Sequence, residues 1–320
     1  MNIISLFAGA GGLDLGFTEA GFNIIWANEF DKTIWKTYEL NHKNSFLNRK
    51  NIKDIKNEEL PENVDGVIGG PPCQSWSLAG SMRGINDKRG ALFYEYIRLL
   101  KSTKAKFFVI ENVKGMLSKT HIDEFNNFLK IFEELGYICS YKLLNAFDYE
   151  TPQTRERVFI VGFRKDLNIK YSFPKSSLKK IYLKDVLEGL ENAVEFNENK
   201  NLTVPNNEYF TGSFSSMFMS RNRIRNYSEA SFTIQASARH APIHPSSPKM
   251  VKIEKDKFKF DGDIAKVRRL SVRECARIQG FPDDFIFLYE NINNGYKMIG
   301  NAVPVRLSYF IAKEISKYLK

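Results

Sequence analysis

Short apolar runs alternate with amphipathic stretches through the first half of the chain. Six runs rich in β-branched and aromatic residues predict strands: NIISLF, FNIIWAN, VDGVIGG, KFFVIEN, YICSYKLLNA and RVFIVGF. Between them, stretches such as GLDLGFTEAG and IDEFNNFLKIFEELG predict helices. Strands this apolar have no face suited to water, which is typical of parallel sheets covered by helices on both sides. The pattern therefore predicts an α/β fold with a doubly wound, mostly parallel sheet.

The pattern changes after Asp166. Residues 167–200 are rich in Lys, Ser and Asn, and the region that follows has short strands, prolines and little helical period, which predicts a second, smaller domain. The last segment, VPVRLSYFIAKEISKYLK, carries a helical apolar stripe that needs a core to cover it. We therefore expect residues 1–168 and 290–320 to form one discontinuous domain, with residues 169–289 as the smaller domain.

The amino-acid composition limits the classes of protein to which this chain can belong. The chain has 320 residues, of which 43% are hydrophobic, enough for a packed core, and its apolar runs are far shorter than the roughly 20 residues that span a bilayer. Cys73, Cys139 and Cys275 are widely separated and lack Cys or His neighbours at ligand spacing, so neither a disulfide framework nor a metal site is predicted. We expect a soluble, cytoplasmic protein with no membrane association, in which Cys139 and Cys275 are core residues.

Positive charge is concentrated in one region. Residues 215–274 contain 13 Lys and Arg against 6 Asp and Glu, a net +7 of the total +10. Such localisation favours a polyanionic partner contacted by this region, and a solvated lysine-rich surface is the alternative that charge alone leaves open.

The first predicted strand ends in a glycine-rich loop, FAGAGGLDLGF, that leads directly into a helix. Gly9, Gly11, Gly12 and Gly16 allow the backbone to approach a ligand at the start of that helix. Gly9 and Gly11 fit the dinucleotide motif GxGxxG, but its last position holds Asp14, which disfavours a nicotinamide cofactor.

Two carboxylates follow the next two predicted strands. Glu29 comes 20 residues after Gly9, at the end of the second strand, where a carboxylate binds ribose hydroxyls in this architecture. Asp54, in NIKDI at the end of the third apparent strand, suits an adenine amino group. Together they favour an adenosine-containing ligand such as S-adenosyl-L-methionine, although the spacing also allows a nucleotide.

The fourth predicted strand leads into GGPPCQSWS, which places Cys73 in a stiff loop. The paired prolines restrict the backbone, and a cysteine thiolate is a strong nucleophile. A lone cysteine is more often a small buried side chain than a nucleophile, so Cys73 alone is only a candidate nucleophile.

Three more polar side chains are expected at the same edge of the sheet. Glu111 and Asn112 end the apolar strand KFFVIEN, and a carboxylate there needs partners or a raised pKa, which suits a catalytic acid. Arg155 and Arg157, in QTRERVFIVGF, lie two residues apart and are predicted to share one face of a strand. Surface arginines in salt bridges are the alternative interpretation.

These motifs, taken in order, resemble the DNA cytosine-5 methyltransferases. The resemblance spans nearly the whole chain and rests on FAGAGGLDLGF, GGPPCQSWS, RGALFYEYIRLL, ENVKGM, QTRERVF, RRLSVRECARIQGFPDDF and YKMIGNAVPV. Within that family, FTGSFSSMFMSRNRIRNYSEASFTIQAS resembles the bacterial restriction-modification enzymes that methylate GGCC. The resemblance implies an S-adenosyl-L-methionine-binding catalytic domain, a small target-recognition domain, and double-stranded DNA between them.

The resemblance also implies roles for the candidate catalytic residues. Cys73 is expected to add to C6 of a flipped-out cytosine, with Glu111 at N3 and Arg157 at O2, while Arg155 and Asn112 support the site. The segment 75–89 is expected to form a lid over the flipped base.

The cofactor and the target sequence are assigned to further positions by the same resemblance. The expected cofactor-binding residues are Phe7, Gly9, Gly11, Gly12, Leu13, Glu29, Phe30, Asp54, Ile55, Pro72, Leu92, Asn301 and Ala302. Lys53 departs from the family, which often has glycine before this aspartate. Guanine contacts are expected from Arg221, Arg223 and Arg239, with phosphate contacts as the alternative, while Arg269, Arg273 and Arg277 are expected to hold the small domain together.

Other functions remain possible from the sequence. An RNA (tRNA) cytosine-5 methyltransferase would share every catalytic motif, and a DNA-binding family member without turnover would share the recognition region. An NAD-dependent oxidoreductase is disfavoured by Asp14. A monomer and a companion restriction endonuclease that acts on the same site are expected from the resemblance.

Overall fold

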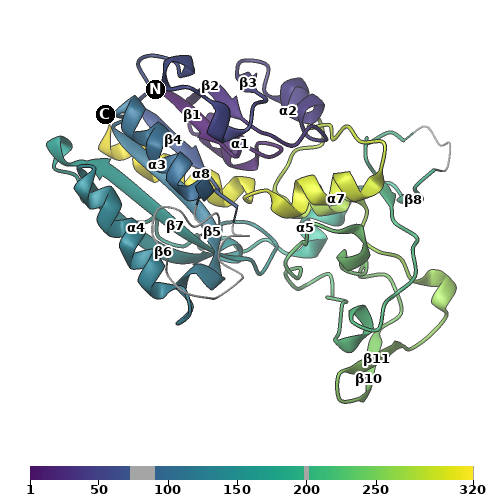
Figure 1. The fold of residues 1–320 in the computed structure, drawn as a ribbon. Helices are drawn as coiled ribbons and strands as arrows, with labels where there is room; N and C mark the ends of the chain where they lie inside the picture. The colour runs from purple at the N-terminus through teal and green to yellow at the C-terminus, as the bar shows by residue number, and fades with distance from the viewer. Residues whose placement is uncertain (73–90, 198–201, 320) are drawn as a thin grey trace. The chain divides into compact units, whose positions relative to one another are not determined.

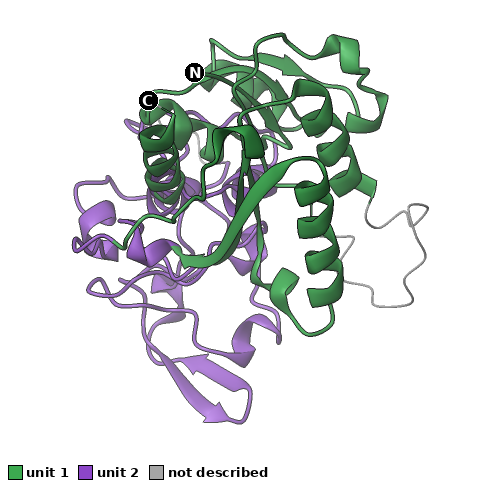
Figure 2. Ribbon diagram, turned by 90° about the vertical axis from the view of Figure 1, so that its left-hand side faces the viewer, with its two compact units in different colours: residues 1–145, 156–176, 307–320 green, residues 146–155, 177–306 purple. Residues whose placement is uncertain are grey.

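The computed structural model describes residues 1–72, 91–197 and 202–319 (Figure 1). The chain forms two compact units, and Figure 2 shows them in different colours. Unit 1 consists of Met1–Asn145, Glu156–Ser176 and Leu307–Lys320, and unit 2 consists of Ala146–Arg155 and Ser177–Arg306. Among the described residues, no helix is both long enough and apolar enough to cross a membrane.

Unit 1 contains, within its described residues, a seven-stranded sheet in the order β3-β2-β1-β4-β5-β7-β6. The strands are β1 (Asn2–Leu6), β2 (Asn23–Asn28), β3 (Phe46–Asn48), β4 (Gly66–Gly69), β5 (Phe107–Val113), β6 (Tyr137–Asn145) and β7 (Glu156–Arg164). Strands β1 to β5 pair in parallel, whereas β7 lies antiparallel between β5 and β6. The predicted mostly parallel sheet is therefore confirmed.

Helices cover both faces of this sheet. They are α1 (Gly12–Glu19), α2 (Trp35–Asn41), α3 (Ala91–Thr103), α4 (Ile122–Glu134) and α8 (Val305–Tyr318). On β5, Phe108 contacts Phe132 of α4, with ring centroids 4.4 Å apart, whereas its neighbour Phe107 faces the other side and contacts Phe163. Phe163 in turn contacts Tyr318 of α8. The doubly wound arrangement follows from this alternation of apolar side chains.

One strand ends earlier than its sequence suggested. The third strand, β3, stops at Asn48, and Ile52–Asp54 forms a turn of 3₁₀-helix rather than the strand end expected at NIKDI. The Asn51 side chain accepts a hydrogen bond from the Lys53 N–H, 3.1 Å away, which caps this turn. Asp54 therefore lies in a capped turn after the sheet edge.

The unit boundaries also differ from those expected. Residues 290–306 belong to unit 2, because the Tyr296 hydroxyl in α7 (Ile292–Asn301) donates to the Leu270 carbonyl, 2.6 Å away, and Gly300 lies against the backbone of Gln235. Residues 169–176 belong to unit 1, where the Tyr171 carbonyl accepts a hydrogen bond from Ser140. Long-range hydrogen bonds thus accompany the limits of the two units.

Unit 2 is built from short elements and irregular chain. Its helices and strands are α5 (Leu183–Leu187), β8 (Val194–Glu195), β9 (Glu208–Tyr209), β10 (Met250–Glu254), β11 (Lys257–Phe260), α6 (Val272–Gln279) and α7. Phe218, Ile224 and Ile243 form a small apolar cluster beside the β10–β11 hairpin. With so little regular structure, many backbone carbonyls of unit 2 need side-chain partners.

Candidate functional site

An ion pair lies at the C-terminal end of β5. Arg157 Nε is 3.0 Å from Glu111 Oε1, and the two side chains are only 15% and 12% exposed. The antiparallel register pairs Glu111 with Phe159 and Val113 with Arg157, so these residues share one face and Arg157 is diagonal to Glu111. The structure therefore brings together the acid and the second arginine that the sequence singled out.

The loop that follows β4 runs beside this pair. A Cβ added at Gly70 would lie 3.2 Å from Glu111 Oε2, so the glycine lets the backbone pass close to the carboxylate. Asn112 Nδ2 donates to the Pro71 carbonyl, 3.1 Å away, while Asn112 Oδ1 accepts from the Val113 N–H at 2.9 Å. Asn112 thus fixes the start of the proline loop. Cys73 and the expected lid, residues 75–89, lie outside the described residues.

Arg155 has a different environment from Arg157. It precedes β7, is 2% exposed, and belongs to unit 2. Its guanidinium donates to three carbonyls of that unit, at Ile234 (3.1 Å), Gly300 (2.9 Å) and Ala302 (3.1 Å). Arg155 therefore anchors the backbone of unit 2, rather than sharing a strand face with Arg157 as the two-residue spacing suggested.

The glycine-rich loop has a strained conformation that needs its glycines. Gly9 and Gly11 have φ values of 57° and 87°, in the left-handed region, and Phe7 has a φ of 55°. The Gly9 N–H donates to Glu29 Oε2, 2.9 Å away, and the Asp31 N–H donates to Glu29 Oε1 at 2.7 Å. Burial raises the pKa of the Glu29 carboxyl, and these two N–H groups oppose that shift. Glu29 thus ties the loop to the end of β2.

The other expected cofactor positions of unit 1 differ in exposure. Phe30 is 64% exposed immediately after Glu29, and Asp54 and Pro72 are also exposed. The remaining positions are buried or half-buried, at Gly12, Leu13, Ile55 and Leu92. This part of unit 1 offers the backbone of a glycine turn, a hydrogen-bonded carboxylate and an exposed aromatic ring. Together these groups fit an adenosine-bearing cofactor. The Trp35 indole, which the sequence did not single out, donates to the Glu29 carbonyl at 2.8 Å.

The three candidate guanine-contacting arginines are not equivalent. Arg221 and Arg239 are exposed, whereas Arg223 is half-buried. Arg223 Nε donates to the Phe218 carbonyl at 2.9 Å, and its guanidinium lies 4.9 Å from the Phe218 ring centroid. Burial, followed by the charge of Arg221, lowers the pKa of Arg223. Arg223 is therefore engaged with its own unit, and Arg221 and Arg239 present the accessible guanidinium groups.

Comparison with known proteins settles the family. The model of the C-5 cytosine-specific DNA methylase family matches residues 1–317. The chain belongs to this family. The methylase is 57% identical over 329 residues to Type II methyltransferase M.FnuDI of Fusobacterium nucleatum, covering 100% of this chain and 95% of the relative. It is 54% identical over 329 residues to Type II methyltransferase M.NgoPII of Neisseria gonorrhoeae, with 100% and 96% covered.

Solved structures agree on the fold of the methylase. A prophage-encoded E. coli protein superposes with a TM-score of 0.75 at 23% identity, covering 100% of this chain and 99% of that chain. The methyltransferase EhMeth of Entamoeba histolytica gives a TM-score of 0.70 at 20% identity, with 100% and 97% covered. The protein is thus a DNA (cytosine-5) methyltransferase that acts on DNA, with the α/β fold predicted from its sequence.

The methylase also contains a buried amide pair that sequence reasoning missed. Gln153 Oε1 accepts from the Ile234 N–H at 2.8 Å, and Gln153 Nε2 donates to Gln279 Oε1 at 2.8 Å. Gln279 Nε2 donates to the carbonyls of Ile299 (2.8 Å) and Ala302 (3.2 Å). This pair fixes the turn in which Ala302 is buried and Asn301 is exposed. In the sequence, the polar residues of QTRER and RIQGF were the signal that could have pointed to this amide pair.

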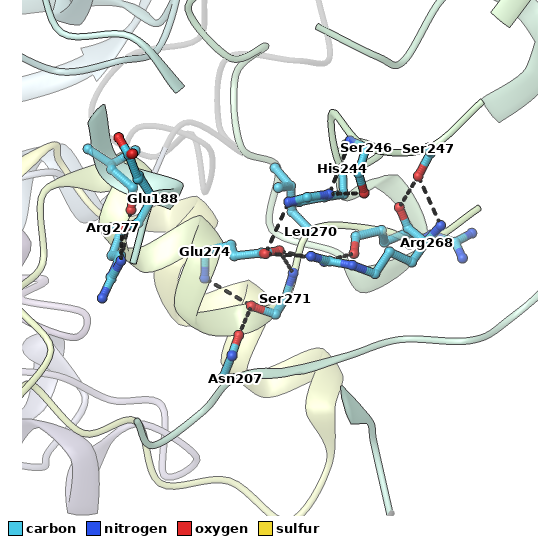
Figure 3. Close-up of polar contacts among 12 residues, drawn as sticks. Glu188, Asn207, His244, Ser246, Ser247, Arg268, Leu270, Ser271, Glu274 and Arg277 are labelled. Carbon is cyan, nitrogen blue, oxygen red and sulfur yellow. Dashed lines mark hydrogen bonds and ion pairs between the residues drawn. The ribbon is translucent and has the colours of Figure 1, made fainter. Parts of the chain in front are cut away.

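A charged network at the start of α6 holds other parts of unit 2 of the methylase (Figure 3). Glu274 is buried and accepts two hydrogen bonds from Arg268, at 2.8 and 2.7 Å. His244 Nε2 lies 3.4 Å from Glu274 Oε1, and the backbone N–H of His244 donates to the Arg268 carbonyl. The Ser271 side chain caps α6 by accepting from the Glu274 N–H at 3.0 Å. The network thus joins α6 to the segment around His244.

Three further arginines in the methylase have the structural role expected from the sequence. Arg269 and Arg273 are 2% and 0% exposed, and their guanidinium groups donate to carbonyls of unit 2, Arg269 to Gly212 and Arg273 to Phe285. Arg277 forms a two-bond ion pair with Asp283, at 2.9 and 2.6 Å. The prediction that these arginines hold the smaller unit together is therefore confirmed.

Proposed function

We propose that this DNA methyltransferase is the modification enzyme of a Type II restriction-modification system. It transfers a methyl group from S-adenosyl-L-methionine to C5 of a cytosine, the inner cytosine of GGCC, in duplex DNA. The observation that carries the proposal is the Glu111–Arg157 pair beside the loop that leads to Cys73. The similarity to Type II methyltransferases supports it. A monomer and a companion endonuclease for the same site complete the proposal.

The chemistry requires a nucleophile because C5 of cytosine is too electron-poor to take a methyl group directly. The Cys73 thiolate forms a bond to C6, and the electron pair displaced from the C5–C6 double bond makes C5 nucleophilic. S-Adenosyl-L-methionine would supply the electrophilic methyl group, and the electron pair of the broken sulfur–methyl bond would stay on sulfur, giving S-adenosylhomocysteine. The proton on C5 then leaves to a base, the double bond re-forms, and the thiolate departs, which restores Cys73.

Glu111 and Arg157 assist this addition. With the target base bound, Glu111 must carry a proton, which its carboxyl group shares with N3 as negative charge develops on the ring, and the Arg157 guanidinium at O2 stabilises the same charge. The 3.0 Å ion pair orients the carboxyl group before the base arrives, which reduces the entropy cost of the reaction. Asn112 holds the Pro71 carbonyl in the described part of the loop that precedes Cys73.

The cofactor is bound, in this proposal, by the glycine loop and the adjoining strand ends. Glu29 would accept hydrogen bonds from the ribose hydroxyls, Phe30 would contact the adenine ring, and Asp54 would accept from its amino group. The backbone of Gly9 to Leu13 would contact the methionine portion. Ile55, Pro72, Leu92, Asn301 and Ala302 complete the proposed set of cofactor-binding residues.

The DNA is read in two steps. The target cytosine must leave the base stack to reach Cys73, at a cost of about a few kcal/mol. The neighbouring guanines are contacted by Arg221 and Arg239, whose exposed side chains can place a guanidinium on O6 and N7 in the major groove. Arg223 supports them from its half-buried position.

One experiment tests the chemistry and the target together. Plasmid DNA from cells expressing the wild type is expected to show protected cytosines in GGCC by bisulfite sequencing, and cells expressing Cys73→Ser are expected to show none. Purified Cys73→Ser should still bind S-adenosyl-L-methionine in calorimetry. Methylation of another sequence would refute the target, transfer to tRNA alone would refute the substrate, and full activity of Cys73→Ser would refute the mechanism.

A further inference from the structure

A cluster of buried polar side chains lies directly behind the glycine-rich loop, and none of them has a role in the proposed chemistry. Asp14, in the first turn of α1, is fully buried. Its carboxylate accepts hydrogen bonds from Ser5 Oγ at 2.6 Å and from the Tyr38 hydroxyl at 2.7 Å. Asp14 is the residue that replaces the last glycine of the dinucleotide motif, so the sequence departs from that motif where the cluster begins.

His42 connects this cluster to the loop. It follows the last residue of α2, and its ring stacks on Tyr38 with centroids 4.4 Å apart. His42 Nε2 lies 3.2 Å from the Ala10 carbonyl oxygen. Burial lowers the pKa of His42, so the imidazole is neutral near pH 7. Because a carbonyl only accepts hydrogen bonds, the ring hydrogen lies on Nε2 and is donated to Ala10.

The same ring also occupies the space beside Gly11. A Cβ at Gly11 would collide with His42 Nε2, and the φ of 87° there is one that side chains rarely adopt. The loop is therefore held on two sides. Gly9 N–H binds Glu29 on the side of the expected cofactor, and the Ala10 carbonyl binds His42 on the side of α2.

A packing role alone does not account for these residue types. Burial raises the pKa of Asp14, which records the cost of placing a carboxylate in the interior. Apolar side chains of similar size would fill the volume without that cost. Hydrogen bonds, unlike apolar contacts, also set the direction of the groups that they join. The cluster is therefore suited to fixing the orientation of the loop backbone.

We propose that His42, oriented by Tyr38 and Asp14, is a positioning residue for cofactor binding. Its hydrogen bond to Ala10 and its contact with Gly11 hold the loop, and through Gly9 also Glu29, in the geometry that S-adenosyl-L-methionine requires. The inference rests on the proposed function, in which this loop binds the cofactor. His42 itself lies behind the loop and acts through Ala10 and Gly11.

Calorimetric titration of the full-length protein with S-adenosyl-L-methionine tests the proposal. His42→Phe keeps an aromatic ring on Tyr38 but removes the donor, and we expect a Kd about tenfold higher than that of the wild type, as for loss of one hydrogen bond. His42→Gln retains an N–H donor and should recover most of the affinity. In kinetics, KM for S-adenosyl-L-methionine should rise in His42→Phe, while kcat and KM for DNA stay within about twofold.

A matched control separates positioning from general stability. Phe132→Leu, in the buried face of α4, should lower the melting temperature without changing the Kd. Equal affinity of His42→Phe and the wild type, or an equal loss in Phe132→Leu, would overturn the proposal. Tyr38→Phe removes the Tyr38 hydrogen bond to Asp14 and must weaken binding in the same direction, so it can replace His42→Phe if that variant does not fold. Failure of the wild type itself to bind would refute the proposed function instead.

Discussion

The Glu111–Arg157 pair shows that the register between two strands determines which side chains meet. Both side chains are nearly buried, so each charge depends on its partner for the solvation that water would otherwise supply. The sequence suggested both residues from their positions at strand ends, but only the antiparallel pairing of β5 with β7 makes them diagonal neighbours. Arg155, two positions earlier, has the same side chain and a structural role, because its partners are backbone carbonyls.

Removal of the Glu111 proton donor is expected to slow catalysis. Glu111→Gln should lower kcat about 100-fold or more, because an amide cannot share a proton with N3 during thiolate addition. Binding of S-adenosyl-L-methionine should remain, since Glu29 and the glycine loop are unchanged. Glu39→Gln is the control, because it breaks an exposed ion pair with Arg49 in the same unit. Turnover of tritiated cofactor on duplex DNA measures both variants, and equal rates would contradict the role of Glu111.

Among the elements, helix α6 shows how a charged sequence can form a core. Its residues VRECARIQ include two arginines and a glutamate, yet Arg273, Glu274 and Gln279 are buried. The reason is that the irregular chain of unit 2 leaves carbonyls without partners, and arginine offers several donors in one side chain. The short helix therefore organises unit 2 through hydrogen bonds as well as through its buried apolar side chains.

The network at α6 predicts a loss of stability in acid. Burial lowers the pKa of His244 from 6.5 to about 4, against the opposing effect of Glu274. Between these pH values the unfolded chain binds a proton that the folded chain does not, so stability is complete above pH 6.5 and falls toward pH 4. At pH 5 the loss from this residue should be about 2 kcal/mol.

Thermal unfolding at pH 7 and pH 5 checks this prediction. His244→Gln lacks the titrating group, so its melting temperature should fall less than that of the wild type over this interval. His240→Gln, in the same unit, should behave like the wild type. Parallel pH profiles for the wild type and His244→Gln would show that His244 does not titrate in this way.

At the scale of the whole molecule, the proposed function divides catalysis and DNA recognition between the two units. Unit 1 carries the ion pair and the glycine loop, and unit 2 carries the basic region, residues 215–274. Helix α8 returns the chain to unit 1, where Ser308 Oγ donates to the Leu13 carbonyl at 2.6 Å. The glycine loop of unit 1 and the basic region of unit 2 can therefore be mutated independently.

That division predicts different responses to salt. Affinity for a GGCC duplex should fall about tenfold or more between 50 and 200 mM salt, because bound phosphates release counterions when basic residues contact them. Affinity for S-adenosyl-L-methionine should change little. Fluorescence anisotropy and calorimetry measure the two affinities. Arg239→Ala, which removes one exposed charge of unit 2, should weaken DNA binding only, and salt-independent DNA affinity would contradict this role of the basic region.

The sequence by itself determined the main strands and helices and selected the candidate site residues. Apolar periodicity is a local property, so it identified the strands and the main helices, and the ends of those strands pointed to Glu29, Glu111 and Arg157. Sequence motifs also identified the family, which the comparisons confirm. The wrong prediction at β3 also arose from a local pattern. NIKDI has the composition of a strand end, but in the structure it forms a capped turn.

Only the tertiary structure decided which residues meet. It placed β7 between β5 and β6, assigned Arg155 to the carbonyls of unit 2, and moved the boundary of that unit to Arg306. It also put His42 behind Gly11, from 31 positions away in the sequence. Hydrogen bonds between distant residues depend on register and on the path of the chain, and neither is encoded in the periodicity of any one segment.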